Sequence, residues 1–179
     1  MNNPAFQRSQ RGVFLLEVLI AIVIFAIGIL AMISMQAVSI AAQNDSQFRV
    51  EAEHLIDQLT SQVRIAVVHD VVTGNVDATS FATFAHNATG AACAFDATPS
   101  TNTVVVGSTT ELGWIRTVRG LNLADSPVPG KGLPGVTDAR IQILANNATA
   151  GINQLRVTIC WQAANDRTAH SHSVVAYID

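Results

Sequence analysis

Residues 11–33 read RGVFLLEVLIAIVIFAIGILAMI, an apolar run with a single carboxylate, Glu17, near its beginning. In a helix that rises about 1.5 Å per residue, the segment from Val13 to Ile33 spans about 30 Å, the thickness of a bilayer's hydrocarbon core. A charge in such a segment costs about 2.5–3.5 kcal/mol on membrane-insertion scales. Glu17 is therefore expected to lie near the interface or to be paired, and a helix that only anchors a protein gains nothing from it.

The residues before the apolar run are basic. Met1 to Gly12 carries Arg8 and Arg11 and no acidic residue, so the positive-inside rule keeps this leader in the cytoplasm and sends the rest across the membrane. A secretory signal would place an Ala-x-Ala-like cleavage site after the run, and residues 34–37 match it poorly. The small residue is Gly12, before the run. Cleavage there would remove the leader and keep the apolar helix.

Composition limits the remaining possibilities. A chain of 179 residues has room for one membrane helix and one modest globular domain. Without the leader, eight basic residues face thirteen acidic ones, and no run of Lys or Arg favours a polyanion. The two cysteines, Cys93 and Cys160, both lie on the exported side, which predicts a disulfide worth about 4 kcal/mol in the chain-entropy model. The alternative is two free buried thiols.

The helix is expected to continue beyond the membrane segment, from Val13 to about Val67 or Val68, because no proline or linker intervenes. Gly28 alone interrupts it and is a candidate flexing point. After Ile33 the pattern becomes amphipathic. The expected apolar stripe consists of Phe48, Ala52, Leu55, Leu59, Val63 and Ala66, with Asp45, Gln47, Glu51, Asp57 and Arg64 outside it.

The rest of the chain indicates a small sheet. Residues 71–108, rich in Ala, Thr, Asn and Gly, are expected to form a loop-like connection, with a short strand at 104–106. Threefold apolar spacing predicts a short helix at 111–121, and prolines and glycines break the structure at 127–135. Alternating patterns predict strands at 139–144, 155–161 and 173–178, with turns at 146–153 and 163–170. The predicted fold class is α+β: a long N-terminal helix packed on a small antiparallel meander.

Few residues suggest chemistry. His170 and His172 could share one side of a strand, but two imidazoles without a third ligand do not make a metal site, and a solvated turn is the expected reading. His69 suits a helix C-terminus. Nucleophile-elbow, phosphate-loop and dinucleotide patterns are missing from the sequence. Two Asn-x-Thr triplets, at Asn87 and Asn147, match the glycosylation sequon by composition and stay unassigned. The sequence predicts no catalytic residue, cofactor or metal, and no enzyme.

The leader, Gly12 and the following residues Val13-Phe14-Leu15-Leu16-Glu17-Val18 resemble the class III signal of type IV pilins and pseudopilins. The resemblance implies that a prepilin peptidase cleaves after Gly12 and N-methylates Val13. It also implies that Glu17, the fifth mature residue, compensates the positive N-terminus of the neighbouring subunit. The first mature residue of this family is more often Phe, so Val13 is a mild departure. An unpaired charge inside a helix bundle costs several kcal/mol, so this pairing would enforce the register between subunits.

Further segments are similar to PilV-type minor pilins. They are Ala26-Ile27-Gly28-Ile29-Leu30, Glu-Leu-Gly-Trp at 111–114, Gly-Leu-Pro-Gly at 132–135 and Val-Thr-Ile-Cys-Trp at 157–161. The resemblance implies the pilin fold and a minor type IV pilin, a structural subunit of a pilus or of its initiating complex. Its partners would be other pilins through the N-terminal helix, the prepilin peptidase, the inner-membrane assembly machinery and the membrane itself. No specific nucleic-acid binding is expected.

The implied location is the bacterial inner membrane, with the leader cytoplasmic and the head periplasmic, followed by the extracellular pilus. Two alternatives remain: a minor pseudopilin of a type II secretion system, and a membrane-anchored periplasmic binding or enzyme domain. The expected segments are a leader (1–12), a transmembrane or filament-core helix (13–33), its amphipathic continuation (34–68) and a globular head (69–179).

Overall fold

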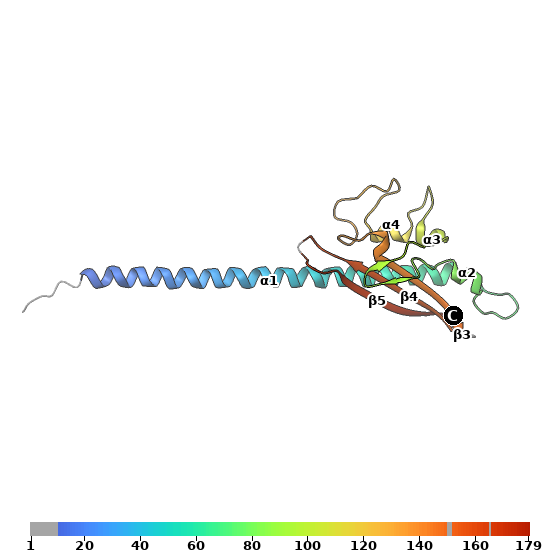
Figure 1. Ribbon diagram of the computed structural model, residues 1–179, viewed down its shortest axis with the longest axis horizontal. Coiled ribbons are helices and arrows are strands. Elements are labelled where there is room, and N and C mark those ends of the chain that lie inside the picture. Colours follow the sequence, from blue (N-terminus) through green and yellow to red (C-terminus); the bar gives the residue numbers. More distant parts are fainter. Residues whose placement is uncertain (1–10, 150–151, 165) are drawn as a thin grey trace, which may run out of the picture. The chain divides into compact units, whose positions relative to one another are not determined.

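The computed structural model describes residues 11–149, 152–164 and 166–179, without the side chains of residues 11–13, 37, 41 and 147–149. The chain divides into two compact units between Ser46 and Gln47, called here the N-terminal unit and the C-terminal unit. The architecture is α+β, as predicted, with one long N-terminal helix and small antiparallel sheets (Figure 1). The four functional segments proposed from the sequence stay a prediction.

Helix α1 covers Arg11–Ala66 without interruption, which agrees with the long helix predicted to end near Val67. Its residues up to Ser46 belong to the N-terminal unit and its last turns to the C-terminal unit. After Ala66 the chain reverses in a tight turn that Asp70 organises. The Asp70 carboxylate accepts hydrogen bonds from the backbone N–H groups of Val72 and Thr73, at 2.9 and 2.8 Å.

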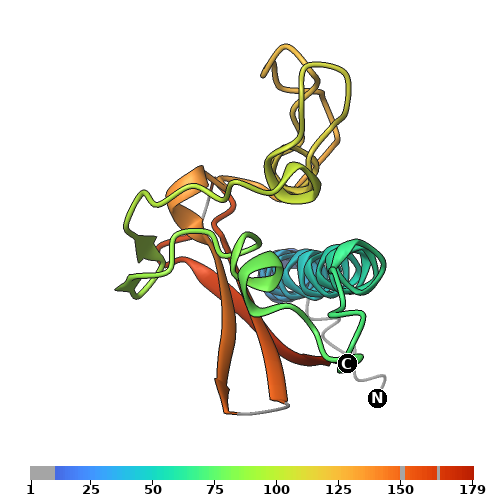
Figure 2. The same cartoon turned by 90° about the vertical axis from the view of Figure 1, so that its right-hand side faces the viewer.

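The core of the C-terminal unit forms between the last turns of α1 and a three-stranded sheet. Strands β3 (Ile141–Thr149), β4 (Ile152–Trp161) and β5 (His170–Ile178) lie side by side in that order, all antiparallel (Figure 2). The predicted meander is therefore confirmed. The α1 residues in this core are Ala52, Leu55, Ile56, Leu59, Val63 and Val67. Of the predicted stripe, Ala52, Leu55, Leu59 and Val63 are buried, Phe48 is partly buried and Ala66 is exposed. Ile56 and Val67, which the predicted stripe omits, are also buried.

Short elements complete the C-terminal unit. They are α2 (Ala78–Ala82), β1 (Gly90–Ala91), β2 (Ala94–Phe95), α3 (Thr103–Val106), α4 (Trp114–Val118) and the 3-10 helix η1 (Asp138–Arg140). Helix α4 confirms the helix predicted at 111–121, within narrower bounds. Its Trp114 indole N–H donates to the backbone carbonyl of Leu55 at 2.6 Å, so this segment is fixed directly to α1.

Residues 104–106 are a helical turn, and the strand predicted there is wrong. Three valines favour a strand, but the Asn102 side chain accepts a hydrogen bond from the Val104 N–H at 3.0 Å and caps a helix. Gly107 ends this turn with φ of 82°, a conformation that favours glycine, and an added Cβ would lie 2.4 Å from the Gly113 nitrogen. Local capping therefore overrides the β-propensity of the valines.

The predicted turns at 146–153 and 163–170 are too long, because backbone pairing continues past the apolar residues. Asn146 pairs with Gln154 and Thr149 with Ile152, so β3 and β4 extend into the polar segment. Asn153 is buried, and its side-chain amide donates to the Ile178 carbonyl at 3.0 Å. His170 and His172 lie inside β5 rather than in a solvated turn.

Candidate functional site

The residues expected to be processed lie at the beginning of α1. Arg11 is the first residue of the helix, and the backbones of Gly12 and Val13 are helical. Residues 1–10 of the predicted leader lie outside the described residues, and so does the side chain of Val13. Their assignment as cleavage and methylation sites therefore stays a prediction from the sequence.

Glu17 follows Val13 by four residues, about one helical turn or 6 Å along the axis. Its side chain is exposed, and no described residue gives it a hydrogen bond or an ion pair. Its neighbours Phe14, Leu16 and Leu19 are apolar and 63–66% exposed. Glu17 is thus an acidic group on an apolar surface, without a partner in the described part of its own chain.

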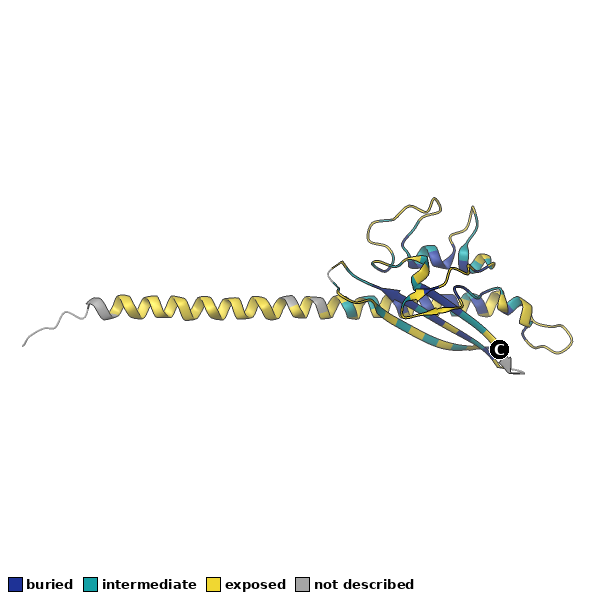
Figure 3. Ribbon diagram, viewed as in Figure 1, coloured by how far each residue is buried: buried dark blue, intermediate teal, exposed yellow. Residues whose placement is uncertain are grey.

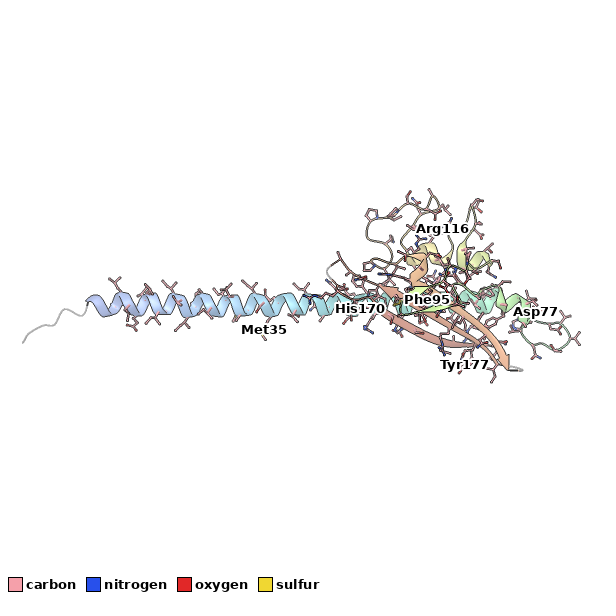
Figure 4. All side chains as sticks on the ribbon, in the orientation of Figure 1. Met35, Asp77, Phe95, Arg116, His170 and Tyr177 are labelled. Carbon is pink, nitrogen blue, oxygen red and sulfur yellow. A yellow bond between two sulfur atoms is a disulfide. The ribbon has the colours of Figure 1, made fainter. Side chains whose placement is uncertain are left out.

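From Phe14 on, the described apolar side chains of the N-terminal unit are exposed, as the colouring of the first part of α1 in Figure 3 shows. Phe25 is 69% exposed, Leu30 is 66% and Met35, labelled in Figure 4, is 77%. Within the described residues, one helix, Phe14–Ala66, is long and apolar enough to cross a membrane, with a mean hydropathy of 3.0 in its best window. No part of that window is buried within the chain.

Gly28 has no packing role inside the chain, because a Cβ added there would meet no atom within 4 Å. A helix built only to be apolar would tolerate alanine here and gain about 0.5–1 kcal/mol of helix stability. The residue therefore fits the predicted flexing point, and it is also suited to the close approach of a second helix.

In the C-terminal unit, Cys93 and Cys160 form the disulfide that the cysteine count indicated, with their Cα atoms 5.7 Å apart. Cys93 lies in the turn between β1 and β2 with φ of 65°, and Cys160 is buried on β4. The bond therefore ties a short two-stranded hairpin to the central strand of the larger sheet.

The buried polar cluster of the C-terminal unit centres on Asn87, which the sequence left as an unassigned sequon. Its fully buried amide donates to the carbonyls of Asp138 and Ile141 at 2.8 and 3.0 Å, and its side-chain oxygen accepts from the Thr98 N–H at 3.0 Å. A side chain held in this way cannot carry a glycan in the folded unit. Asn147 lies outside the residues whose side chains are described.

His86, next to Asn87, is equally buried and holds the same segment. Its Nδ1 accepts the Ser100 N–H at 3.1 Å, and its Nε2 lies 3.4 Å from a carboxylate oxygen of Asp138. Burial lowers the pKa of His86 below its ordinary value of 6.5, and the nearby Asp138 carboxylate opposes this shift. The ring is therefore neutral at pH 7. No sequence pattern predicts this pair, since polar residues in an Ala- and Thr-rich segment favour a loop.

His170 and His172, the pair of imidazoles noted in the sequence, both lie on β5. The His170 ring stacks on Trp161 at a centroid distance of 6.1 Å and lies 3.4 Å from an Asp166 carboxylate oxygen. The described residues contain no group of three His, Cys, Asp or Glu side chains suited to a metal ion. His69, placed by sequence at a helix end, contacts the Asp179 carbonyl through Nε2 at 3.2 Å. His170 and His69 thus link structural elements to one another.

Comparison with known proteins gives one result. Residues 7–33 match the prokaryotic N-terminal methylation motif, a segment that contains Gly12, Val13 and Glu17. No curated protein and no solved structure was found to match the chain. The motif supports a type IV pilin-like or pseudopilin-like protein with an N-terminal membrane anchor, and the α+β architecture is consistent with a pilin fold.

Proposed function

We propose that this chain is a minor type IV pilin, a structural subunit that enters a type IV pilus or primes its assembly. In this proposal a prepilin peptidase cleaves after Gly12 and methylates the new N-terminus at Val13. The filament would then serve adhesion, motility or DNA uptake. The match to the methylation motif over residues 7–33 supports the processing step.

The observation that carries the proposal is Glu17, a carboxylate on an exposed apolar helix that has no partner among the residues the structure describes. A membrane anchor would be more stable without it. In a bundle of staggered helices, Glu17 of one subunit would neutralise the Val13 ammonium of the next, and this contact would set their register. An unpaired charge inside the bundle would cost several kcal/mol. A subunit that cannot form the pair between Glu17 and the neighbouring Val13 ammonium would therefore be excluded from the filament.

The proposed role is non-enzymatic, and the chemistry is done to the chain by its partners. These are the prepilin peptidase, the inner-membrane assembly machinery and other pilins, which contact it through the N-terminal helix. Before assembly the chain would span the inner membrane once, with the leader in the cytoplasm and the C-terminal unit in the periplasm. Afterwards it would be part of an extracellular pilus.

Two other functions make different predictions. A minor pseudopilin of a type II secretion system would share the processing and the Glu17 pairing but would be found in a periplasmic pseudopilus rather than in sheared surface filaments. A membrane-anchored periplasmic binding or enzyme domain would need neither. Mass analysis of the mature N-terminus distinguishes the membrane-anchored domain from the other two. The anchored domain predicts an intact Met1, whereas the pilin and the pseudopilin predict a methylated Val13.

The direct test is the variant Gly12→Leu, because a bulky residue would not fit a peptidase subsite that selects glycine. The full-length precursor should accumulate in the membrane fraction on immunoblots. Ala26→Leu is the matched control, since it adds the same side chain to the same helix and leaves Gly12 in place; it should be processed normally. Mature protein of normal size from Gly12→Leu would refute the proposed processing.

A further inference from the structure

The two edges of the three-stranded sheet differ. The outer edge of β3 is paired at Ile143, because the His86 N–H donates to the Ile143 carbonyl at 2.9 Å and the Ile143 N–H donates to the His86 carbonyl at 2.8 Å. The segment around His86 thus acts as a short extra strand. At the opposite edge, β5 pairs only with β4 in the described part of the chain.

Two hydrogen bonds show which way the backbone of β5 points. The Ile178 carbonyl accepts the side-chain amide of Asn153, a β4 residue, so it faces β4. The preceding carbonyl, of Tyr177, accepts instead from the Arg64 guanidinium of α1 at 3.0 Å. Backbone groups of successive strand residues point in opposite directions. The groups of Ser171, Ser173, Val175 and Tyr177 therefore face away from β4.

This outward row is unpaired over most of its length. No described residue forms a backbone hydrogen bond with Ser171, Ser173 or Val175 on that side. The row spans about 20 Å at about 3.3 Å per residue. The same four residues are exposed, with Val175 and Tyr177 at 39% and 54%, and β5 runs along the lower margin of the sheet in Figure 1.

β5 also lacks the features with which natural proteins protect an edge strand. Its sequence, HSHSVVAYI, contains no Lys, Arg, Asp, Glu or Pro. Its register with β4 continues without a bulge from the Asn153–Ile178 pair to the Trp161–His170 pair. A long, regular and uncharged open edge is suited to the addition of another strand.

We propose that the outer edge of β5 binds an extended strand of a different protein by β-strand addition. Backbone donors and acceptors repeated at every second residue fit an extended strand, whereas a helix has its backbone groups already paired. The bound segment would be about seven residues long and uncharged at its centre. This inference does not depend on the proposed function, because the open edge and Arg64 both belong to the C-terminal unit and the occupant is defined by its own sequence.

The positive charge of Arg64, at the C-terminal end of the β5 edge, indicates a further property of the bound strand. Arg64 lies beside Tyr177, is exposed, and forms no ion pair with a described residue. The bound strand should therefore carry a carboxylate at the end that reaches Arg64. A second copy of β5, paired antiparallel across a two-fold axis, would bring its His170 end to Arg64, and its Asp179 would lie at the opposite end of the edge. A strand of different sequence is therefore favoured over self-association.

The test uses the full-length protein in detergent micelles and a synthetic peptide, acetyl-Glu-Thr-Val-Thr-Val-Thr-Val amide, at about 1 mM. Residue-resolved amide exchange is the readout. If the peptide binds with a Kd near 0.1 mM, exchange should slow about tenfold at Ser171, Ser173 and Val175. The amides of His172, Val174 and Ala176, already bonded to β4, should not change. Unchanged exchange at all three outward amides would overturn the proposal.

Three variants make the test specific. Ser173→Lys places a charge on the edge and should abolish protection, whereas Thr158→Lys places the same charge on its cross-strand neighbour in β4 and should not. Val175→Pro removes one outward N–H, which an edge strand tolerates, and should also abolish protection. Thermal unfolding of each variant checks that the sheet is intact. Equal protection in Ser173→Lys and Thr158→Lys would overturn the proposal.

The occupant is tested by two further measurements. A peptide with Gln in place of Glu should bind wild-type protein about threefold to fivefold more weakly, and the difference should vanish in Arg64→Gln, as expected for an exposed ion pair. A difference that persists in Arg64→Gln would overturn the assignment of the carboxylate. Protection of the same amides without peptide, rising with protein concentration, would identify a second copy as the occupant and overturn the choice of a foreign strand.

Discussion

The two units of the chain treat their apolar and charged side chains in opposite ways. In the N-terminal unit, apolar side chains such as Phe25 and Leu30 are exposed, and Glu17 has no partner among the described residues. In the C-terminal unit, apolar side chains such as Leu59, Phe81 and Ile143 are fully buried. The first unit is unfavourable in water and needs surroundings of low polarity, whereas the second contains its own core.

The buried polar groups sharpen this contrast. Asn87 is completely buried, and both ends of its side chain are hydrogen bonded within the C-terminal unit. A buried amide without those bonds would cost about 1–3 kcal/mol. Glu17 would face a larger penalty in a membrane or a helix bundle, and no described residue of its own chain offsets that penalty. The C-terminal unit is therefore stabilised by contacts within the chain, whereas the N-terminal unit provides the proposed contacts with other chains.

The largest expected effect is that of the variant Glu17→Ala, which tests the contrast between the two units. Glu17→Ala should leave processing, membrane insertion and the C-terminal unit intact, because it removes a costly charge four residues beyond the cleavage site. Its incorporation into sheared filaments should fall at least tenfold, since the ammonium of a neighbouring Val13 would then be buried without compensation. Immunoblots of the membrane and filament fractions measure both quantities.

Glu53→Ala is the control for that experiment, because it removes an exposed acidic side chain from the same helix within the C-terminal unit. It should enter filaments at wild-type amounts. If the Glu17→Ala protein also enters filaments at wild-type amounts, the carboxylate has no role in assembly. The proposed role of the N-terminal unit in association would then be wrong.

The second prediction concerns the disulfide, which should stabilise only the C-terminal unit. Closing a loop with a sequence separation of 67 residues contributes about 4 kcal/mol in the chain-entropy model. The double variant Cys93→Ser/Cys160→Ala should therefore lose about that much unfolding free energy in urea titrations followed by β-sheet circular dichroism. The helical signal of the membrane segment should persist, since that unit holds no cysteine.

Alkylation of the wild-type protein checks the bond itself. Two groups should be added after reduction and none before it. If both thiols are labelled without reductant, the pair is not bonded and the alternative of two free cysteines applies.

The sequence predicts those features that depend on simple periodicity. Helix α1 follows from a long apolar and then amphipathic pattern without proline, and the β3–β4–β5 meander follows from alternating apolar residues. The disulfide follows from the count of two cysteines, both of which the sequence predicts to be exported. Gly12, Val13 and Glu17 are recognisable because their motif is contiguous, and no tertiary contact is needed to define it.

The features that the sequence does not reveal depend on contacts between distant residues. Asn87 becomes a structural residue only because the carbonyls of Asp138 and Ile141 come beside it in the folded unit. The Val104–Val106 turn is helical because a single side chain, Asn102, caps it. The open edge of β5 is partly readable, since residues 170–178 lack charge and proline, but only the register with β4 shows which backbone groups remain unpaired.

The smallest expected effect is a pH dependence confined to the C-terminal unit, caused by His86. Its Nδ1 must be unprotonated to accept the Ser100 N–H, and burial lowers its pKa below 6.5 while the facing Asp138 carboxylate limits the shift. Between the lowered pKa and 6.5 the unfolded chain binds more protons than the folded one, so unfolding free energy rises with pH and is lost as pH falls through this window.

In His86→Asn, the side-chain oxygen can still accept from Ser100 but does not titrate. Urea midpoints measured between about pH 5 and pH 8 should therefore depend less on pH in His86→Asn than in wild type or in the exposed-site control His54→Asn. Parallel curves for His86→Asn and wild type would show that His86 does not couple protonation to folding.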